Sequence, residues 1–177
     1  MAPDTTSLTE AMAAARDQHG VSLLDHSRER STLVVFLRHA GCPFCAEAIS
    51  DVSKQRTAIE GRSVHIVFVC QWPDGQALHL FENAGIVDLP RIHDPKRTLY
   101  NAFGLRRGNL WQIGGPFVWF RVLQAALTGH RVGRVLGDAF QMPGTFLIRD
   151  GEIIHRYKHR SQASRPNYLR LANQQSQ

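Results

Sequence analysis

The sequence has only three cysteines among its 177 residues and no long hydrophobic run. Three cysteines in a chain of this length do not form the disulfide framework of a small secreted domain. No stretch reaches about 18 apolar residues, so we predict no membrane span. The N-terminal segment carries Asp4, Glu10, Arg16 and Asp17 without a long apolar core, which argues against a signal peptide. Together these absences predict a cytoplasmic location in a reducing compartment.

The sequence also has little clustering of charge of one sign. Lys and Arg number 21 against 15 Asp and Glu, which gives a net charge of +6. The basic residues are scattered, apart from the stretches 28–30 and 156–165, so the pattern favours a basic surface over nucleic-acid binding. Hydrophobic residues make up 43% and charged residues 20%, which are values of a globular chain. The length indicates one domain that buries about 70% of its unfolded surface.

Cys42 and Cys45 lie where a predicted strand passes into a predicted helix. The strand is the apolar, β-branched run 33–37, and the helix covers 46–59. Pro43 suits the first helical position, where its missing N–H has no partner to lose. Cys42 is then the N-cap residue, and Cys45 lies on the same helical face.

This arrangement predicts a redox-active dithiol. A helix N-terminus offers unpaired N–H groups and the positive end of the dipole, and both favour a thiolate. The pKa of a free cysteine, about 8.5, falls by one to several pH units at such a site, and the thiolate is the nucleophile. Two alternatives stay open: a zinc site completed by His39 and Cys70, and two ordinary buried cysteines.

The remaining elements predict a mixed sheet. Helices are expected over 7–19 and 76–83, after Asp94–Pro95, over 117–127 and after Arg165–Pro166. Strands are expected over 64–69, over 90–93, at the end of 137–148 and over 152–157. The stretch 23–31 reads as a connection, and Asp150–Gly151 is a two-residue hairpin turn. Two β–α–β units predict parallel strands with right-handed crossovers, and the hairpin adds an antiparallel strand. The fold class is a three-layer α/β/α sandwich.

The predicted chain has an N-terminal helical extension over 1–30, one domain over 31–172 and a polar tail over 173–177. The apolar segment 117–127 is expected to cover part of the core. Alternatively, it forms a contact surface, for example of a homodimer, or lies on a membrane surface.

Three segments carry a resemblance to a known family. Cys42-Pro43-Phe44-Cys45, the segment Met142 to Ile148 before a hairpin, and the final helix resemble the thioredoxin fold. With the segments 94–105 and 137–144 and with His159–Arg160, the chain looks like the peroxiredoxin-like branch of the alkyl hydroperoxide reductase and thiol-specific antioxidant (AhpC/TSA) family. The resemblance covers roughly residues 30–172.

The resemblance implies that Pro143 is a cis-proline packed against the cysteine pair, with a backbone that would bind a partner's chain; the alternative is an ordinary trans proline. Typical peroxiredoxins carry Pro-x-x-x-Thr-x-x-Cys. Counting back from Cys42 gives His39 in place of Thr and Val35 in place of Pro, and counting back from Cys45 gives no match either. The hydroxyl that would orient a peroxide is therefore absent.

Several residues are candidates for supporting roles. Arg38 and Arg160 are candidate cations beside the thiolate. His39 donates a hydrogen bond to the thiolate or peroxide, or else caps the loop, and Thr145 follows Pro143 in the matching segment. Cys70, at the carboxyl end of a central strand, is either an accessory resolving thiol or a buried small residue.

These observations predict a thiol oxidoreductase with an antioxidant role that uses Cys42 and Cys45 to reduce peroxides or disulfides. An external thiol reductant of thioredoxin or glutathione type would restore the dithiol, and no cofactor or metal is expected. Two alternatives stay open: a disulfide reductase without peroxidase activity, and a non-catalytic binding module of thioredoxin fold.

Overall fold

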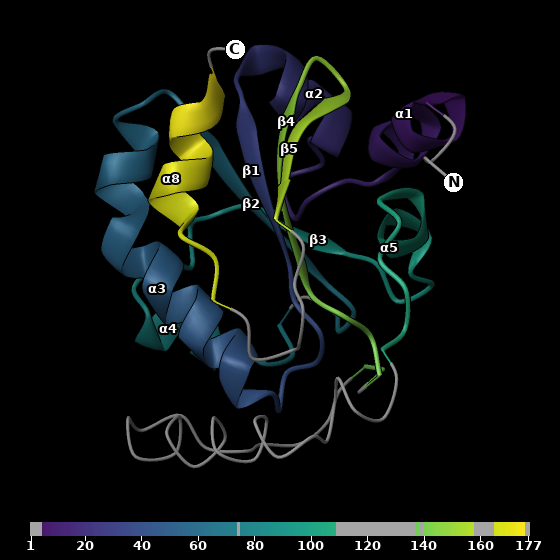
Figure 1. Ribbon diagram of the computed structural model, residues 1–177. Coiled ribbons are helices and arrows are strands. Elements are labelled where there is room, and N and C mark those ends of the chain that lie inside the picture. The colour runs from purple at the N-terminus through teal and green to yellow at the C-terminus, as the bar shows by residue number, and fades with distance from the viewer. Residues whose placement is uncertain (1–4, 74, 109–136, 139, 158–164, 176–177) are drawn as a thin grey trace.

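A five-stranded mixed sheet forms the centre of the molecule (Figure 1). The computed structural model describes residues 5–73, 75–108, 137–138, 140–157 and 165–175. The strand order is β3-β2-β1-β4-β5. The strands are β1 Thr32–Phe36, β2 His65–Cys70, β3 Arg91–His93, β4 Gly144–Arg149 and β5 Glu152–Tyr157. β1, β2 and β3 pair in parallel, β4 runs antiparallel to β1, and β5 runs antiparallel to β4. This confirms the predicted mixed sheet.

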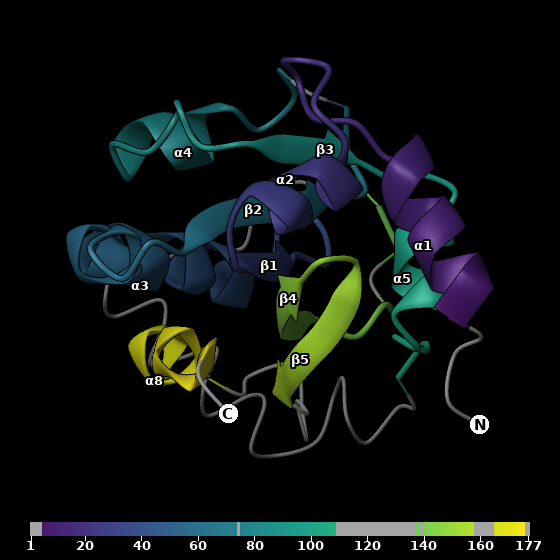
Figure 2. The same cartoon turned by 90° about the horizontal axis from the view of Figure 1, so that it is seen from above.

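Helices cover both faces of the sheet (Figure 2). They are α1 Thr5–Ala14, α2 Leu23–Glu29, α3 Pro43–Glu60, α4 His79–Asn83, α5 Thr98–Ala102 and α8 Tyr168–Ala172, followed by a 3-10 turn over Asn173–Gln175. Figure 2 shows α3, α4 and α8 on one side of the sheet and α1 and α5 on the other. These three layers confirm the predicted α/β/α sandwich.

The core has two halves because β1 is apolar on both faces. Leu33, Val35 and Leu37 pack on the α3 side, whereas Val34 and Phe36 pack on the side of α1 and α5. Successive strand residues point to opposite faces, so a continuous apolar run is what a central strand of a covered sheet requires. The unbroken run that follows residue 32 therefore fixes the place of β1 in the middle of the sheet.

The N-terminal segment differs from the prediction in two places. The first helix ends at Ala14 rather than near His19, because the Asp17 carboxylate accepts hydrogen bonds from the N–H groups of His19 and Val21 and turns the chain. The stretch expected to be a connection contains α2. Ser22 caps this helix by accepting a hydrogen bond from the Asp25 N–H, 3.1 Å long. The prediction missed α2 because its buried face is short.

The helix expected after Asp94–Pro95 begins three residues later, at Thr98. The Asp94 carboxylate accepts hydrogen bonds from the N–H groups of Thr98 and Leu99, each 2.8 Å long. Arg97 bends the chain into the helix with a left-handed φ of 59°. Asp94 thus stabilises the helix start as predicted, but from further away. Likewise, α4 begins at His79 rather than near residue 76.

The C-terminal hairpin matches the prediction. Asp150 and Gly151 take φ values of 51° and 80°, which suit the tight turn of a two-residue hairpin. The strand after the turn covers Glu152–Tyr157 as expected. Arg165 anchors the segment before α8 to α3, because its Nε donates a 2.9 Å hydrogen bond to the Asp51 carboxylate. Over the described residues, no helix combines the length and hydrophobicity needed to cross a membrane.

Candidate active site

The two cysteines lie at the N-terminus of α3, beyond the carboxyl end of β1 (Figure 1). The Leu37 N–H still donates to the Val69 carbonyl, so β1 follows β2 to this point. The chain then turns, and the Cys42 N–H donates to the His39 carbonyl over 3.1 Å. Cys42 is the N-cap residue, and Pro43 occupies the first turn of the helix. This local geometry is as predicted, since Pro43 fixes where the helix begins.

Arg38 contacts both sulfur atoms. Its guanidinium Nη1 donates to the Cys42 Sγ over 3.3 Å, and its backbone N–H donates to the Cys45 Sγ over 3.2 Å. The guanidinium Nε donates to the Gln141 carbonyl over 2.8 Å. Arg38 is only 3% exposed, so water screens its charge little. One residue therefore places a cation at the first sulfur and a hydrogen-bond donor at the second.

The surroundings of the two thiols shift their pKa values in opposite directions. The pKa of Cys42 falls to about 6, chiefly because the Cys45 thiol hydrogen-bonds its sulfur, with the Arg38 charge adding to the effect against the cost of burial. The N–H groups of Phe44 and Cys45 also favour this thiolate, although Cys42 makes no regular capping hydrogen bond. Burial raises the pKa of Cys45 well above its usual range. Cys42 is thus the acidic thiol, and Cys45 keeps its proton.

The sulfurs are not bonded to each other, and all three cysteines are buried thiols that form no disulfide. A thiolate beside a protonated thiol is the reduced form of a dithiol that can close to a disulfide. Cys42 would attack first, since the thiolate is the nucleophile. Cys45 is then placed to attack the product formed on Cys42.

His39 lies in the turn before Cys42 and is 7% exposed. Burial and the Arg38 charge lower the pKa of its ring to about 4, so the ring is neutral at pH 7. Its carbonyl accepts the Cys42 N–H, so its backbone shapes the loop. The ring Nδ1 is buried without a hydrogen-bond partner among the described residues. Within the described part of the chain, this nitrogen is thus an unsatisfied polar atom of a neutral ring.

Pro143 and Thr145 lie across from the second cysteine. Both line a small pocket with Cys45, Phe44 and Tyr168. The expectation of a cis bond at Pro143 is wrong, since none of the peptide bonds in the described ranges is cis. The trans form is the lower-energy state of an X–Pro bond by about 0.5–1 kcal/mol. Met142, in this trans geometry, donates its N–H to the Arg106 carbonyl over 3.3 Å.

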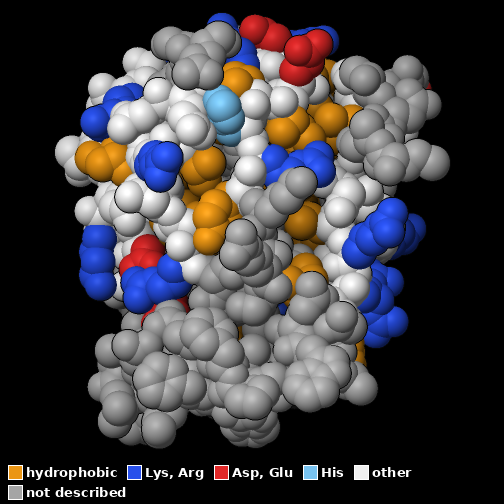
Figure 3. Space-filling model, viewed as in Figure 1, with side chains coloured by type: hydrophobic (Ala, Val, Ile, Leu, Met, Phe, Trp, Pro, Cys, Tyr) orange, Lys and Arg blue, Asp and Glu red, His pale blue; other side chains and the backbone are white. Residues whose placement is uncertain are grey.

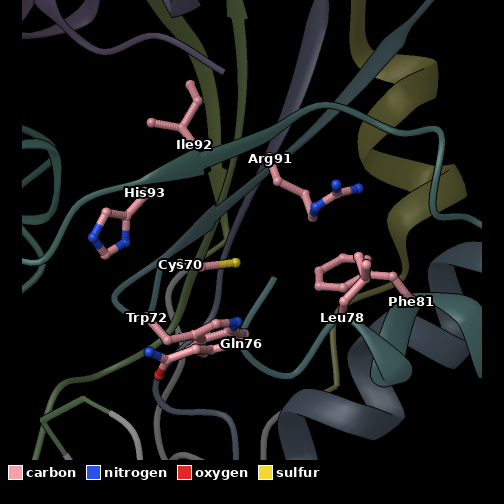
Figure 4. A pocket seen from close by; sticks show the side chains of 8 residues that line it. All are labelled: Cys70, Trp72, Gln76, Leu78, Phe81, Arg91, Ile92 and His93. Atoms are coloured by element: carbon pink, nitrogen blue, oxygen red, sulfur yellow. The ribbon is translucent and has the colours of Figure 1, made fainter. Parts of the chain in front are cut away.

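Cys70 ends β2 and is 4% exposed. Figure 4 shows its sulfur in a pocket lined by Trp72, Gln76, Leu78, Phe81, Arg91, Ile92 and His93. This is a different pocket from the one that Cys45 lines. The accessory role of Cys70 stays a prediction. In the described part of the chain, no group of three or more His, Cys, Asp or Glu side chains is placed to hold a metal ion.

The structure adds residues that the sequence did not indicate. The backbone carbonyl of Gln141 accepts a hydrogen bond from Arg38 and so orients it. Every residue has such a carbonyl, so no sequence pattern could indicate this contact. The Gln71 side chain accepts the Asp138 N–H over 2.9 Å and so fixes the segment that leads to Gln141. Tyr100, which is fully buried, donates its hydroxyl to the carbonyls of Leu37 and Val69 at the ends of β1 and β2. Asp138 and Gln141 belong to the 137–144 segment that carried the resemblance.

Two predicted features lie outside the described residues. These are Arg160, the second candidate cation, and the apolar segment 117–127.

Comparisons with known proteins agree on the family. A family model described as "AhpC/TSA antioxidant enzyme" matches residues 48–163, which is more than half of the chain and begins just after the cysteine pair. The chain is 28% identical to "Peroxiredoxin-like 2C" of Bos taurus over 142 residues, 75% of this chain and 61% of that protein. The human protein of the same name is 28% identical over 72% of this chain and 60% of its own length. The chain thus spans about three fifths of these curated relatives.

Solved structures show the same fold at low sequence identity. "Peroxidoxin BcpB" of Mycobacterium tuberculosis superposes with a TM-score of 0.63 at 16% identity, over 92% of each chain. The thioredoxin domain of a thiol-disulfide oxidoreductase from Bacteroides vulgatus superposes with a TM-score of 0.52 at 15% identity, over 88% of this chain and 85% of that one. With its thioredoxin-like fold and the match over residues 48–163, the chain belongs to the AhpC/TSA antioxidant enzyme family.

Proposed function

We propose that the chain is a thiol peroxidase in which Cys42 reacts with a hydroperoxide and Cys45 resolves the product. The contacts of Arg38 with both sulfurs are the observation that carries the proposal. With the pKa of Cys42 at about 6, about nine tenths of this thiol is ionised at pH 7. The nucleophile is therefore present without a separate base.

The reaction has two steps. The Cys42 thiolate attacks one oxygen of the hydroperoxide; a sulfur–oxygen bond forms, the oxygen–oxygen bond breaks, and the leaving alkoxide or hydroxide takes a proton. The Cys45 thiolate then attacks the sulfenic acid on Cys42 and displaces hydroxide, which leaves as water with the proton that Cys45 gives up. The first step yields an alcohol, or water when the oxidant is hydrogen peroxide; the second yields water and the Cys42–Cys45 disulfide.

Burial favours a small oxidant over a protein disulfide. Cys42 is 2% exposed and Cys45 is 3% exposed. A hydroperoxide group needs room beside the sulfur for only two oxygen atoms. A protein disulfide must instead align its sulfur–sulfur bond with the attacking sulfur while it stays attached to its own folded chain. The family motif's threonine is absent here, and Arg38 supplies a hydrogen-bond donor and a charge beside the sulfur instead.

Disulfide exchange is the second candidate, and the placement of the two cysteines in a Cys-x-x-Cys pair at a helix N-terminus favours it. The two activities differ in which oxidant consumes the thiols quickly. If the burial of the Cys42 sulfur determines which oxidant reacts, a hydroperoxide should consume the thiols faster than a disulfide does.

The test counts free thiols. Reduced protein carrying Cys70→Ser is mixed with a small excess of hydrogen peroxide, and free thiols are counted over seconds. A thiol peroxidase loses both remaining thiols quickly and forms a Cys42–Cys45 disulfide that peptide mapping identifies. Slow loss with peroxide but fast reduction of a test disulfide would assign disulfide exchange instead. If neither oxidant consumes the thiols, the remaining assignment is a non-catalytic binding module. The Cys42→Ser variant, which lacks the nucleophile, is the control.

A further inference from the structure

Asp138 closes a turn with Gln141, because its backbone carbonyl accepts the Gln141 N–H over 3.1 Å. Its carboxylate Oδ1 accepts the Phe140 N–H over 2.9 Å within the same turn. The other carboxylate oxygen, Oδ2, lies 2.8 Å from the Arg97 Nη1 and 2.9 Å from the Arg107 Nε. One side chain therefore joins the turn to the start of α5 and to the segment that follows α5.

The two arginines reach the same carboxylate oxygen, so the negative charge of Asp138 keeps them together. Without this charge, two guanidinium groups would face each other at close range and repel. Figure 3 shows that Lys and Arg side chains gather on the side of the molecule where Figure 1 places α5. Removal of the carboxylate would therefore separate Arg97 and Arg107 and free the turn from both.

The other end of the turn is fixed as well. Gln141 is 1% exposed, and its side-chain Nε2 donates to the carbonyls of Leu105 and Met142, each over 3.2 Å. The Met142 N–H donates to the Arg106 carbonyl over 3.3 Å. The Gln141 carbonyl accepts the hydrogen bond from the Arg38 Nε over 2.8 Å. This carbonyl is thus a firmly held acceptor for the guanidinium.

The guanidinium of Arg38 transmits the position of this carbonyl to the reacting sulfur. A guanidinium is planar, and its N–H donors point in fixed directions. While Nε donates to the Gln141 carbonyl, Nη1 donates to the Cys42 Sγ over 3.3 Å. A shift of the carbonyl would therefore move the donor at the sulfur. Because Arg38 is buried, water screens the charge little, and the attraction depends strongly on this geometry.

We propose that Asp138 is a positioning residue for the reaction of Cys42. It acts through the turn: its carboxylate holds the Gln141 carbonyl in place, and this carbonyl aims the Arg38 guanidinium at the reacting sulfur. The inference rests on the proposed function only in taking Cys42 as the reacting thiol. It requires no contact between Asp138 and the oxidant.

The charge of Asp138 and its positioning effect act on Cys42 in opposite directions. A carboxylate near a thiol disfavours the thiolate, so removal of the charge alone would lower the pKa of Cys42. Displacement of the Arg38 guanidinium by about 1 Å would instead weaken its attraction for the thiolate by about a quarter. We therefore expect the pKa of Cys42 to rise by about half to one pH unit in Asp138→Ala. A fall, or no change, would overturn the inference.

His39 is a titratable ring on which the Asp138 charge also acts. Burial and the Arg38 charge lower the pKa of this ring to about 4, and the Asp138 charge opposes them. Without the carboxylate the pKa of the ring would fall further, so the ring stays neutral over the range in which Cys42 titrates. Protonation of His39 therefore cannot produce the expected shift of the Cys42 pKa.

The measurement is the rate at which iodoacetamide alkylates Cys42 in the reduced full chain, taken against pH in a Cys70→Ser background. Asp138→Asn keeps an oxygen for the Phe140 N–H but loses the charge that pairs with the arginines, so the pKa should rise by less than in Asp138→Ala. Asp138→Asn carries the test if circular dichroism shows that Asp138→Ala is unfolded.

A matched control removes another carboxylate that pairs with an arginine. Asp88 accepts a hydrogen bond from the Arg56 Nη1 over 2.8 Å, and this pair joins α3 to the segment before β3. Asp88→Asn should leave the pKa of Cys42 unchanged. A rise in Asp88→Asn as large as that in Asp138→Asn would overturn the inference, because any lost ion pair would then have the same effect.

A double variant shows whether the effect passes through Arg38. In an Arg38→Gln background the guanidinium is already gone, so Asp138→Ala should no longer raise the pKa of Cys42. A rise of the same size in both backgrounds would overturn the inference.

Alkylation needs no oxidant, so the positioning role and the peroxidase are tested separately. If Asp138→Ala raises the pKa but peroxide does not consume the thiols of the parent chain, the thiol peroxidase is rejected and the positioning role stands. Fast consumption of the thiols by peroxide, with no rise of the pKa in either Asp138 variant, rejects the positioning role alone.

Discussion

The contact between Arg38 and Cys42 leads to a quantitative prediction. The Nη1 of Arg38 lies 3.3 Å from the Cys42 sulfur, and both groups are buried. Two opposite unit charges at this distance attract by about 5 kcal/mol at an effective dielectric constant of about 20. In an Arg38→Gln variant, water and the new amide replace part of this attraction. We therefore expect the pKa of Cys42 to rise from about 6 by about one to two pH units.

The rate of alkylation of Cys42 by iodoacetamide, measured against pH, gives this pKa. Cys70→Ser serves as the background so that the signal comes from the cysteine pair. Arg38→Lys keeps the positive charge but loses the forked hydrogen-bond donor. The pKa of Cys42 in this variant should lie between its values in the parent and in Arg38→Gln. Arg28→Gln should leave the pKa unchanged, and thermal unfolding identifies any variant that is not folded. A folded Arg38→Gln variant that titrates like its parent would refute the reasoning.

Three further predictions concern other residues. Cys45→Ser should lose one thiol instead of two with peroxide, and a sulfenic acid trapped by dimedone should persist on Cys42. Gly137→Ala should slow peroxide reduction, because φ is 114° there and the new Cβ would lie 3.1 Å from the Gln71 Cβ, which displaces the segment that holds the site. Asp17→Asn should lower the free energy of unfolding by about 1–3 kcal/mol at pH 7 in urea titrations. Burial opposes ionisation of Asp17, but hydrogen bonds from the His26 ring and from two backbone N–H groups lower its pKa below 3.8. The part of the stability that depends on this ionisation is fully present well above pH 3.8 and is lost as pH falls through the lowered pKa, so the difference between the two proteins should shrink there.

The features that the sequence predicted well depend on neighbouring residues. Pro43 beside Cys42 fixes the helix start, and the apolar run in β1 fixes a central strand, because both signals are read within a few positions. The hairpin turn at Asp150 is of the same kind. The fold class and the position of the cysteine pair therefore needed no distant contacts.

The features that the sequence missed depend on distant contacts or on backbone atoms. Arg38 is oriented by the carbonyl of Gln141, which is 103 positions away and carries no side-chain signal. The sequence of α2 is mostly polar, so it does not indicate a helix whose buried side carries Leu23 and Leu24. The cis bond expected at Pro143 came from the resemblance alone and is absent here. Such details are set by packing across the sheet rather than by local pattern.

The most direct test of the account is the titration of Cys42 in the otherwise native chain, with Cys45 present and then replaced by alanine. We predict a pKa of about 6 with Cys45 in place, and a higher value in Cys45→Ala, because the thiol that hydrogen-bonds the Cys42 sulfur is then gone. A Cys42 that titrates near the ordinary cysteine pKa of about 8.5 in the native chain would contradict the account.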